Sequence, residues 1–74
     1  MKPEEWVQGF AEKLGEAAPS EDEFNAVLEL AAVAAHSSER TAAPLAAWLA
    51  GRSGRSLQEV QALAEGIAPD PGAK

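Results

Sequence analysis

Apolar residues recur at helical spacing in four stretches of the chain, and polar or helix-breaking segments separate them. In the first stretch, residues 3–15, Trp6, Val7, Phe10 and Leu14 fall on one stripe at about 100° per residue. No stretch alternates apolar and polar positions with β-branched residues, as a half-buried strand would. The pattern therefore predicts helices throughout.

Capping signals mark where three of these helices begin. Ser20 starts S-E-D-E and Ser56 starts S-L-Q-E, and both runs match the capping box, in which a glutamate three residues on reaches back to the cap. Thr41 or Ala43 caps the third helix, whose first turn holds Pro44, and the run Gly51-Arg52-Ser53-Gly54-Arg55 is expected to break it. We expect an all-α fold, a compact bundle of four short amphipathic helices. Residues 1–68 would form a single helical domain and residues 69–74 a disordered tail.

The apolar stripe of each helix is expected to face a common core. In the second helix, Leu30 and Val33 lie beside the main stripe and widen it. The predicted core consists of Trp6, Val7, Phe10, Leu14, Phe24, Val27, Leu28, Ala31, Leu45, Trp48, Leu49, Leu57, Val60, Leu63 and Ile67.

Length and charge narrow the classes of function. The chain has 74 residues, no cysteine and a net charge of −6, and all of that charge comes from residues 1–35, which carry eight acids and two lysines. A core of this size rarely supplies more than about 3–5 kcal/mol of stability, so a partner or self-association is the expected source of more. The negative net charge disfavours binding to nucleic acid. No apolar run approaches the ~20 residues of a membrane span, and we expect a cytoplasmic protein without membrane contact.

The residues for catalysis are missing. There is no cysteine or tyrosine, and Ser20 and Ser56 are used as helix caps. The paired acids Glu4 and Glu5 lie in a first helical turn, where they complement the helix dipole. With one histidine, a zinc site would be unusual. We predict no enzyme activity, no metal and no cofactor.

One cluster of residues could recognise an anion. His36 ends the second helix, and Arg40 and Thr41 precede the third, whose free N–H groups can hold a negative charge. The alternative is structural: His36 and Arg40 would cap the carbonyls of the second helix or pair with Glu29 or Glu39.

Three other residues are predicted to form an interface. Trp6 lies near the chain start, where full burial is difficult, and tryptophan is a frequent interface anchor. Leu30 and Val33 add apolar surface to a helix that already has a broad apolar face. A protein partner or a second copy, in a homodimer, could cover them.

The segment 35–45, which reads A-H-S-S-E-R-T-A-A-P-L, resembles the motif A-H-x-x-E-R-P-A-A-P-L of a small actinobacterial family of unknown function. The resemblance extends over residues 4–68 through Glu5-Trp6, Leu14-Gly15 and the run 28–32. Thr41 departs from the motif's proline, and Arg52-Ser53 replaces apolar residues at the end of the third helix. Members occur alone or associated with molybdopterin-guanine dinucleotide biosynthesis proteins of the guanylyltransferase type. The resemblance implies an accessory role in making the molybdenum cofactor, without nucleotidyl transfer by this chain.

Three functions remain open from the sequence. The first is a non-catalytic protein-interaction or assembly module in molybdenum-cofactor biosynthesis. The second is a small anion-binding or ligand-binding module that uses the Arg40 corner. The third is an acidic inhibitor or mimic that occupies a basic surface through residues 4–29.

Overall fold

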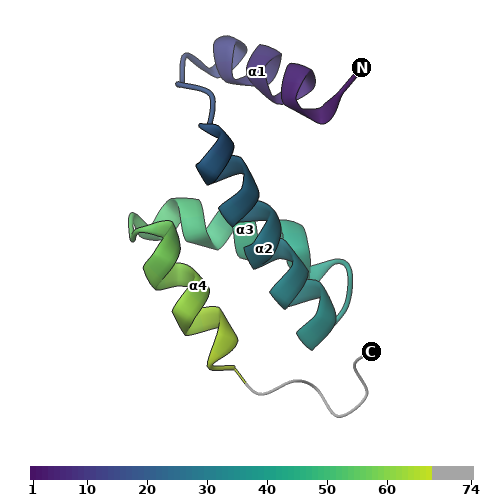
Figure 1. Cartoon of the computed structure of the whole chain (residues 1–74), viewed down its shortest axis with the longest axis vertical. Helices are drawn as coiled ribbons and strands as arrows, with labels where there is room; N and C mark the ends of the chain where they lie inside the picture. Colours follow the sequence, from purple (N-terminus) through teal and green to yellow (C-terminus); the bar gives the residue numbers. More distant parts are fainter. Residues whose placement is uncertain (68–74) are drawn as a thin grey trace.

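The computed structural model describes residues 1–67 and contains four helices (Figure 1). They are α1 (Pro3–Leu14), α2 (Glu21–Ser37), α3 (Ala42–Ser53) and α4 (Leu57–Glu65). The predicted all-α bundle of four short helices is confirmed, and residues 1–67 contain no strand. No helix in this part of the chain is long and apolar enough to cross a membrane. The predicted tail, residues 69–74, lies outside the described residues.

The predicted serine caps set the starts of α2 and α4. At α2, the Ser20 hydroxyl accepts the Glu23 N–H at 3.1 Å, and the Glu23 carboxylate accepts the Ser20 N–H at 2.8 Å. This is a complete capping box. At α4, the Ser56 hydroxyl accepts the Glu59 N–H at 3.1 Å. The Glu59 carboxylate pairs with Arg55, one turn earlier on the surface.

The end of α3 lies further along the chain than the sequence suggests. The helix continues through Gly51 to Ser53, and the Ser53 hydroxyl donates to the Ala50 carbonyl at 2.8 Å. Gly54 follows with φ of +73°, a left-handed conformation that glycine adopts without a steric penalty. Gly54 therefore ends the helix, and Gly51 lies inside it.

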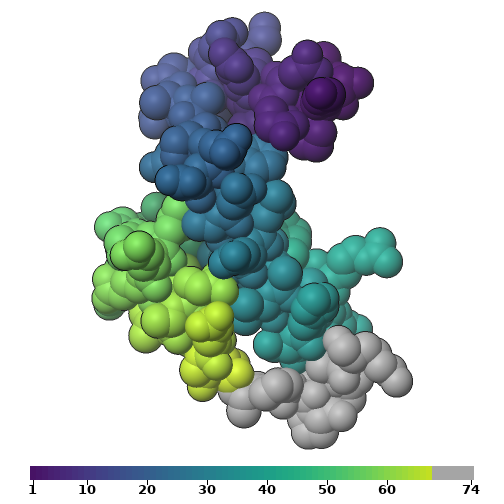
Figure 2. Space-filling view, viewed as in Figure 1, coloured from purple at the N-terminus to yellow at the C-terminus, as the bar shows by residue number. Residues whose placement is uncertain are grey.

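Helix α2 is the centre of the fold. It contacts both α3 and α4, whereas α1 has only sparse contact with the other helices. In Figures 1 and 2, α1 lies at the top of the molecule beyond the start of α2, joined to it by residues 15–20. The packed part of the fold is thus a three-helix unit made by α2, α3 and α4.

The predicted core is wrong for most of its large side chains. Among the described residues, only Ala11, at 7% exposed, and Leu30, at 3%, are buried. Nine predicted core residues are instead 49–67% exposed, because α1 stands apart and α3 turns its larger side chains outward. These nine are Trp6, Phe10, Leu14, Leu28, Leu45, Trp48, Leu49, Leu63 and Ile67. The chain by itself leaves much of its apolar surface in water.

Candidate interaction surfaces

The predicted anion corner lies between α2 and α3. His36 is in the last turn of α2, Arg40 is in the connection and Thr41 precedes α3, and all three residues are exposed. Within residues 1–67, neither His36 nor Arg40 makes a side-chain hydrogen bond or an ion pair; the ion pair found there joins Arg55 and Glu59. The described part of the chain thus does not show the predicted bonds to Glu29 or Glu39.

The start of α3 offers few free N–H groups to an anion. The Ala42 N–H donates to the Glu39 carbonyl at 2.9 Å, and the Ala43 N–H donates to the Arg40 carbonyl at 3.1 Å. Pro44, the next residue, has no N–H. Among the backbone donors at the start of α3, those of Ala42 and Ala43 are therefore engaged, and Pro44 contributes none. What remains is an exposed arginine beside a hydroxyl, without a hollow formed around them by buried polar groups.

Helix α1 presents an unpartnered aromatic and aliphatic stripe. Trp6, Phe10 and Leu14 follow one another at intervals of four residues and are 57%, 49% and 59% exposed. The two rings lie with centroids 5.1 Å apart and planes inclined by 33°, a contact that fixes both side chains on the helix surface. This set of three is called the α1 stripe below. Glu5 and Lys13 border a hollow beside the two rings.

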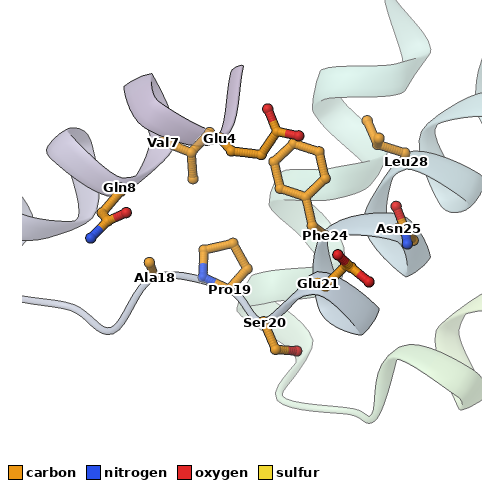
Figure 3. A pocket seen from close by; sticks show the side chains of 10 residues that line it. All are labelled: Glu4, Val7, Gln8, Ala18, Pro19, Ser20, Glu21, Phe24, Asn25 and Leu28. Carbon is orange, nitrogen blue, oxygen red and sulfur yellow. The ribbon is translucent and has the colours of Figure 1, made fainter. Parts of the chain in front are cut away.

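A hollow of about 450 Å³ separates the other side of α1 from α2. Figure 3 shows Val7 of α1, Pro19 of the connection and Phe24 of α2 bordering it from three sides. Leu28, which is 55% exposed, also lines the hollow. Helices α1 and α2 thus border a common open space, in keeping with the sparse packing of α1.

Helix α3 has two apolar faces of different kinds. Its alanines, at positions 42, 43, 46, 47 and 50, are half-buried and occur on the side that packs against the bundle. Leu45, Trp48 and Leu49 lie on the outward side, 55–63% exposed, and the Arg52 guanidinium rests 4.9 Å from the centre of the Trp48 ring. We call Leu45, Trp48, Leu49 and Arg52 the α3 face. Small side chains inside let α2 and α3 approach closely, and the larger ones remain exposed.

The outward α3 face adjoins an apolar groove. A groove of about 280 Å³ lies between α3 and α4, with Leu30 among its lining residues. Leu49 borders it from α3, and Leu63 and Ile67 border it from the α4 side. These last two side chains are 57% and 67% exposed. The α3 face and the groove together form one continuous apolar surface, because Leu49 belongs to both.

The three predicted interface residues differ in how far the structure exposes them. Trp6 is exposed, as an interface residue must be, and Val33 is half-buried. Leu30 is the most buried residue described and lies in the interior of the fold, so it is not available to a partner. The α3 face was not predicted from the sequence as an exposed surface. The signal for it was present in the alternation of alanines with Leu45, Trp48 and Leu49.

The described residues do not gather the groups that catalysis or metal binding needs. Within residues 1–67, no group of three or more His, Asp or Glu side chains is placed to hold a metal ion. The acids lie mostly in first helical turns, with Glu4, Glu5 and Glu21 as examples. The fold and these surfaces together define a small all-α domain with unpartnered apolar faces.

The chain belongs to the family described as "Domain of unknown function (DUF6457)", whose model matches residues 2–70. The match covers nearly the whole chain and assigns no activity. No curated protein matches the chain, and no solved structure matches it.

Proposed function

We propose that this chain is a non-catalytic protein-interaction module that docks through the α1 stripe onto a partner protein. The observation that carries the proposal is the exposure of Trp6, Phe10 and Leu14 on a helix that barely contacts the rest of its own fold. Large apolar side chains gathered on one face of a soluble domain are typical of interaction sites.

The geometry of the stripe fits one known mode of recognition. An amphipathic helix can lay its apolar face into a groove of a partner, with anchors spaced by three or four residues. Trp6, Phe10 and Leu14 have that spacing. Tryptophan is among the residues that contribute most to such interfaces. Because one acid and one base, Glu5 and Lys13, border the stripe, a groove with charges of both signs at its rim is the complementary surface.

The family resemblance supports one partner. It points to the guanylyltransferase-type protein that makes molybdopterin-guanine dinucleotide, so we propose an accessory role beside that enzyme in the cytoplasm. In this role the chain binds and positions, and the enzyme performs nucleotidyl transfer. The family described as of unknown function is compatible with such a role and does not assign it.

The direct test is calorimetric titration of the chain into the purified guanylyltransferase of the same organism. We expect saturable binding, weakened at least about 30-fold by Trp6→Glu, because an interface anchor of this kind is worth roughly 2 kcal/mol or more. Trp6→Phe, which keeps an aromatic ring, should retain most of the affinity. Gln58→Glu adds the same charge on exposed α4 and serves as the matched control.

Two results would count against the proposal in different ways. No heat of binding with the wild-type chain would reject the guanylyltransferase as partner. Equal affinity of Trp6→Glu and wild type would reject the α1 stripe as the docking element.

A further inference from the structure

We propose that the α3 face is a self-association surface: two copies pair their α3 helices antiparallel, and Trp48 of each enters the groove between α3 and α4 of the other. This deepens the proposed interaction function by naming the occupant of a second surface, and it rests on that function. The starting observation is that α3 packs inward through alanine and presents Leu45, Trp48 and Leu49 to water.

The exposed area agrees with the needs of a stable dimer. Leu45, Trp48, Leu49, Leu63 and Ile67 are 55–67% exposed and line one continuous surface. A fully exposed tryptophan presents ~150–250 Å², and with four smaller aliphatic side chains the area exposed here is on the order of 500 Å². A standard interface buries about 800 Å² on each partner, and about 65% of a homodimer interface is apolar, or roughly 500 Å². One α3 face with its groove therefore supplies the apolar part of such an interface.

The distribution of charge selects α3 as the place where two copies can meet. Each copy carries a net charge of −6, so copies repel one another at long range. The acids are concentrated in residues 1–35, on α1, its connection and α2. Helix α3 contains no acid, and its one charged residue is Arg52. Contact through α3 buries apolar surface without bringing carboxylates of the two copies together.

The spacing of the α3 face selects an antiparallel arrangement. Leu45, Trp48, Leu49 and Arg52 are separated by three, one and three positions, so the order of gaps is the same in both directions. A two-fold axis between positions 48 and 49 then pairs Trp48 with Leu49, and Leu45 with Arg52, of the second copy. In a parallel pair, the two Arg52 guanidinium groups would face each other. The antiparallel pair separates them by about 10 Å along the helix axis.

The same two-fold axis brings Trp48 to the groove. Leu49, the residue that Trp48 of the second copy would contact, borders the groove lined by Leu63 and Ile67. Arg52, 4.9 Å from the centre of the Trp48 ring, orients that ring within its own chain. Each copy thus contributes one indole and one groove. The two contacts are equivalent, as an isologous dimer requires.

The first test is the mass of the full chain by analytical ultracentrifugation over a dilution series. We expect the wild type to sediment at twice the chain mass at high concentration, with a dissociation constant raised at least about 30-fold by Trp48→Glu. Leu45→Glu should act in the same direction. Trp6→Glu is the matched control, because Trp6 is equally exposed but lies on α1, and it should leave the dimer intact. Circular dichroism of each variant shows whether the helices persist.

The second test fixes the register and uses the absence of cysteine from the chain. Leu49→Cys lies beside the proposed axis and should form a disulfide-linked dimer on mild oxidation. Leu45→Cys alone should not form such a disulfide, since the two cysteines of the dimer would be about 10 Å apart along the helices, beyond disulfide reach. An equimolar mixture of Leu45→Cys and Arg52→Cys should give the mixed dimer. Rapid cross-linking of Leu45→Cys with itself would overturn the antiparallel arrangement.

The two proposals fail separately. A wild-type chain that is monomeric at every concentration, or a Trp48→Glu variant that dimerises as well as wild type, overturns the self-association of α3. Neither result changes the titration with the guanylyltransferase, which depends on Trp6. Loss of guanylyltransferase binding with an intact dimer would instead reject the α1 proposal alone.

Discussion

Leu28 and Leu30 lie two positions apart on α2 and have opposite environments. Leu30 is 3% exposed and lines the space between α3 and α4, whereas Leu28 is 55% exposed beside the hollow next to α1. The side of α2 that carries Leu30 meets both neighbouring helices. Leu30 is therefore a buried side chain at the centre of the three-helix unit, whereas Leu28, of the same size, stays largely in water.

Truncating these two leucines should have very different effects on stability. Leu30→Ala is expected to lower the free energy of unfolding by about 2–5 kcal/mol, because it opens a cavity in the small packed centre. Leu28→Ala is expected to cost about 0.5 kcal/mol, as for other exposed positions. Urea denaturation followed by circular dichroism measures both, at one protein concentration because association shifts apparent stability. Equal losses for the two variants would show that the centre of the fold lies elsewhere.

At the scale of helices, the ends are encoded locally. Ser20 and Ser56 cap α2 and α4 through bonds to residues three positions later, and Gly54 ends α3 in a left-handed conformation. Each of these signals acts within a few residues, so each can be read from the sequence. The end of α3 is the exception, because Gly51 resembled a helix stop and is an interior position.

Two glycines near the end of α3 should respond oppositely to alanine. Gly51→Ala is expected to stabilise the chain by about 0.5–1 kcal/mol, since a helical glycine costs backbone entropy and an added Cβ meets no atom within 4 Å. Gly54→Ala is expected to destabilise it by about 1 kcal/mol or more, because φ of +73° is strained for any residue with a Cβ. Thermal melts of the two variants beside wild type decide the sign of each effect. A stabilised Gly54→Ala variant would mean that this residue leaves the left-handed region.

The faces of the helices were harder to predict than their ends. Periodicity identified Leu45, Trp48 and Leu49 as one stripe, which the structure confirms. It did not reveal which neighbour the stripe meets, because an apolar face can cover the chain's own core or a partner. The inward face of α3 is made of alanines, which carry little hydrophobic signal. The anion corner stays a prediction, and the bonds of Ala42 and Ala43 that bear on it depend on turn geometry, which periodicity does not reveal.

At the scale of the whole molecule, an acidic surface and apolar faces have opposing effects on association. The net charge of −6 separates copies, and the exposed apolar residues bring them together. Salt screens the first effect over a Debye length of about 10 Å at 0.1 M. Salt does not screen the attraction that comes from burying apolar surface.

Raising the salt concentration should therefore strengthen the dimer. We expect the dimer dissociation constant to fall several-fold between about 0.02 and 0.5 M sodium chloride, because repulsion between two like-charged copies is screened. Sedimentation equilibrium at the two salt concentrations measures the change. Binding to a basic partner through residues 4–29, as an acidic mimic would bind, should weaken instead. A dimer that dissociates as salt rises would indicate that ion pairs hold the copies together.

The placement of the two tryptophans gives each proposed surface its own optical reporter. Trp6 lies on the α1 stripe and Trp48 on the α3 face, both are more than half exposed, and the chain has no tyrosine. In the Trp6→Phe variant, all indole emission comes from Trp48, so a shift to shorter wavelength with rising concentration would follow the α3 face alone. In the Trp48→Phe variant, the emission follows the α1 stripe alone. Tryptophan fluorescence of the two variants can thus distinguish which face is removed from water, and at which concentration.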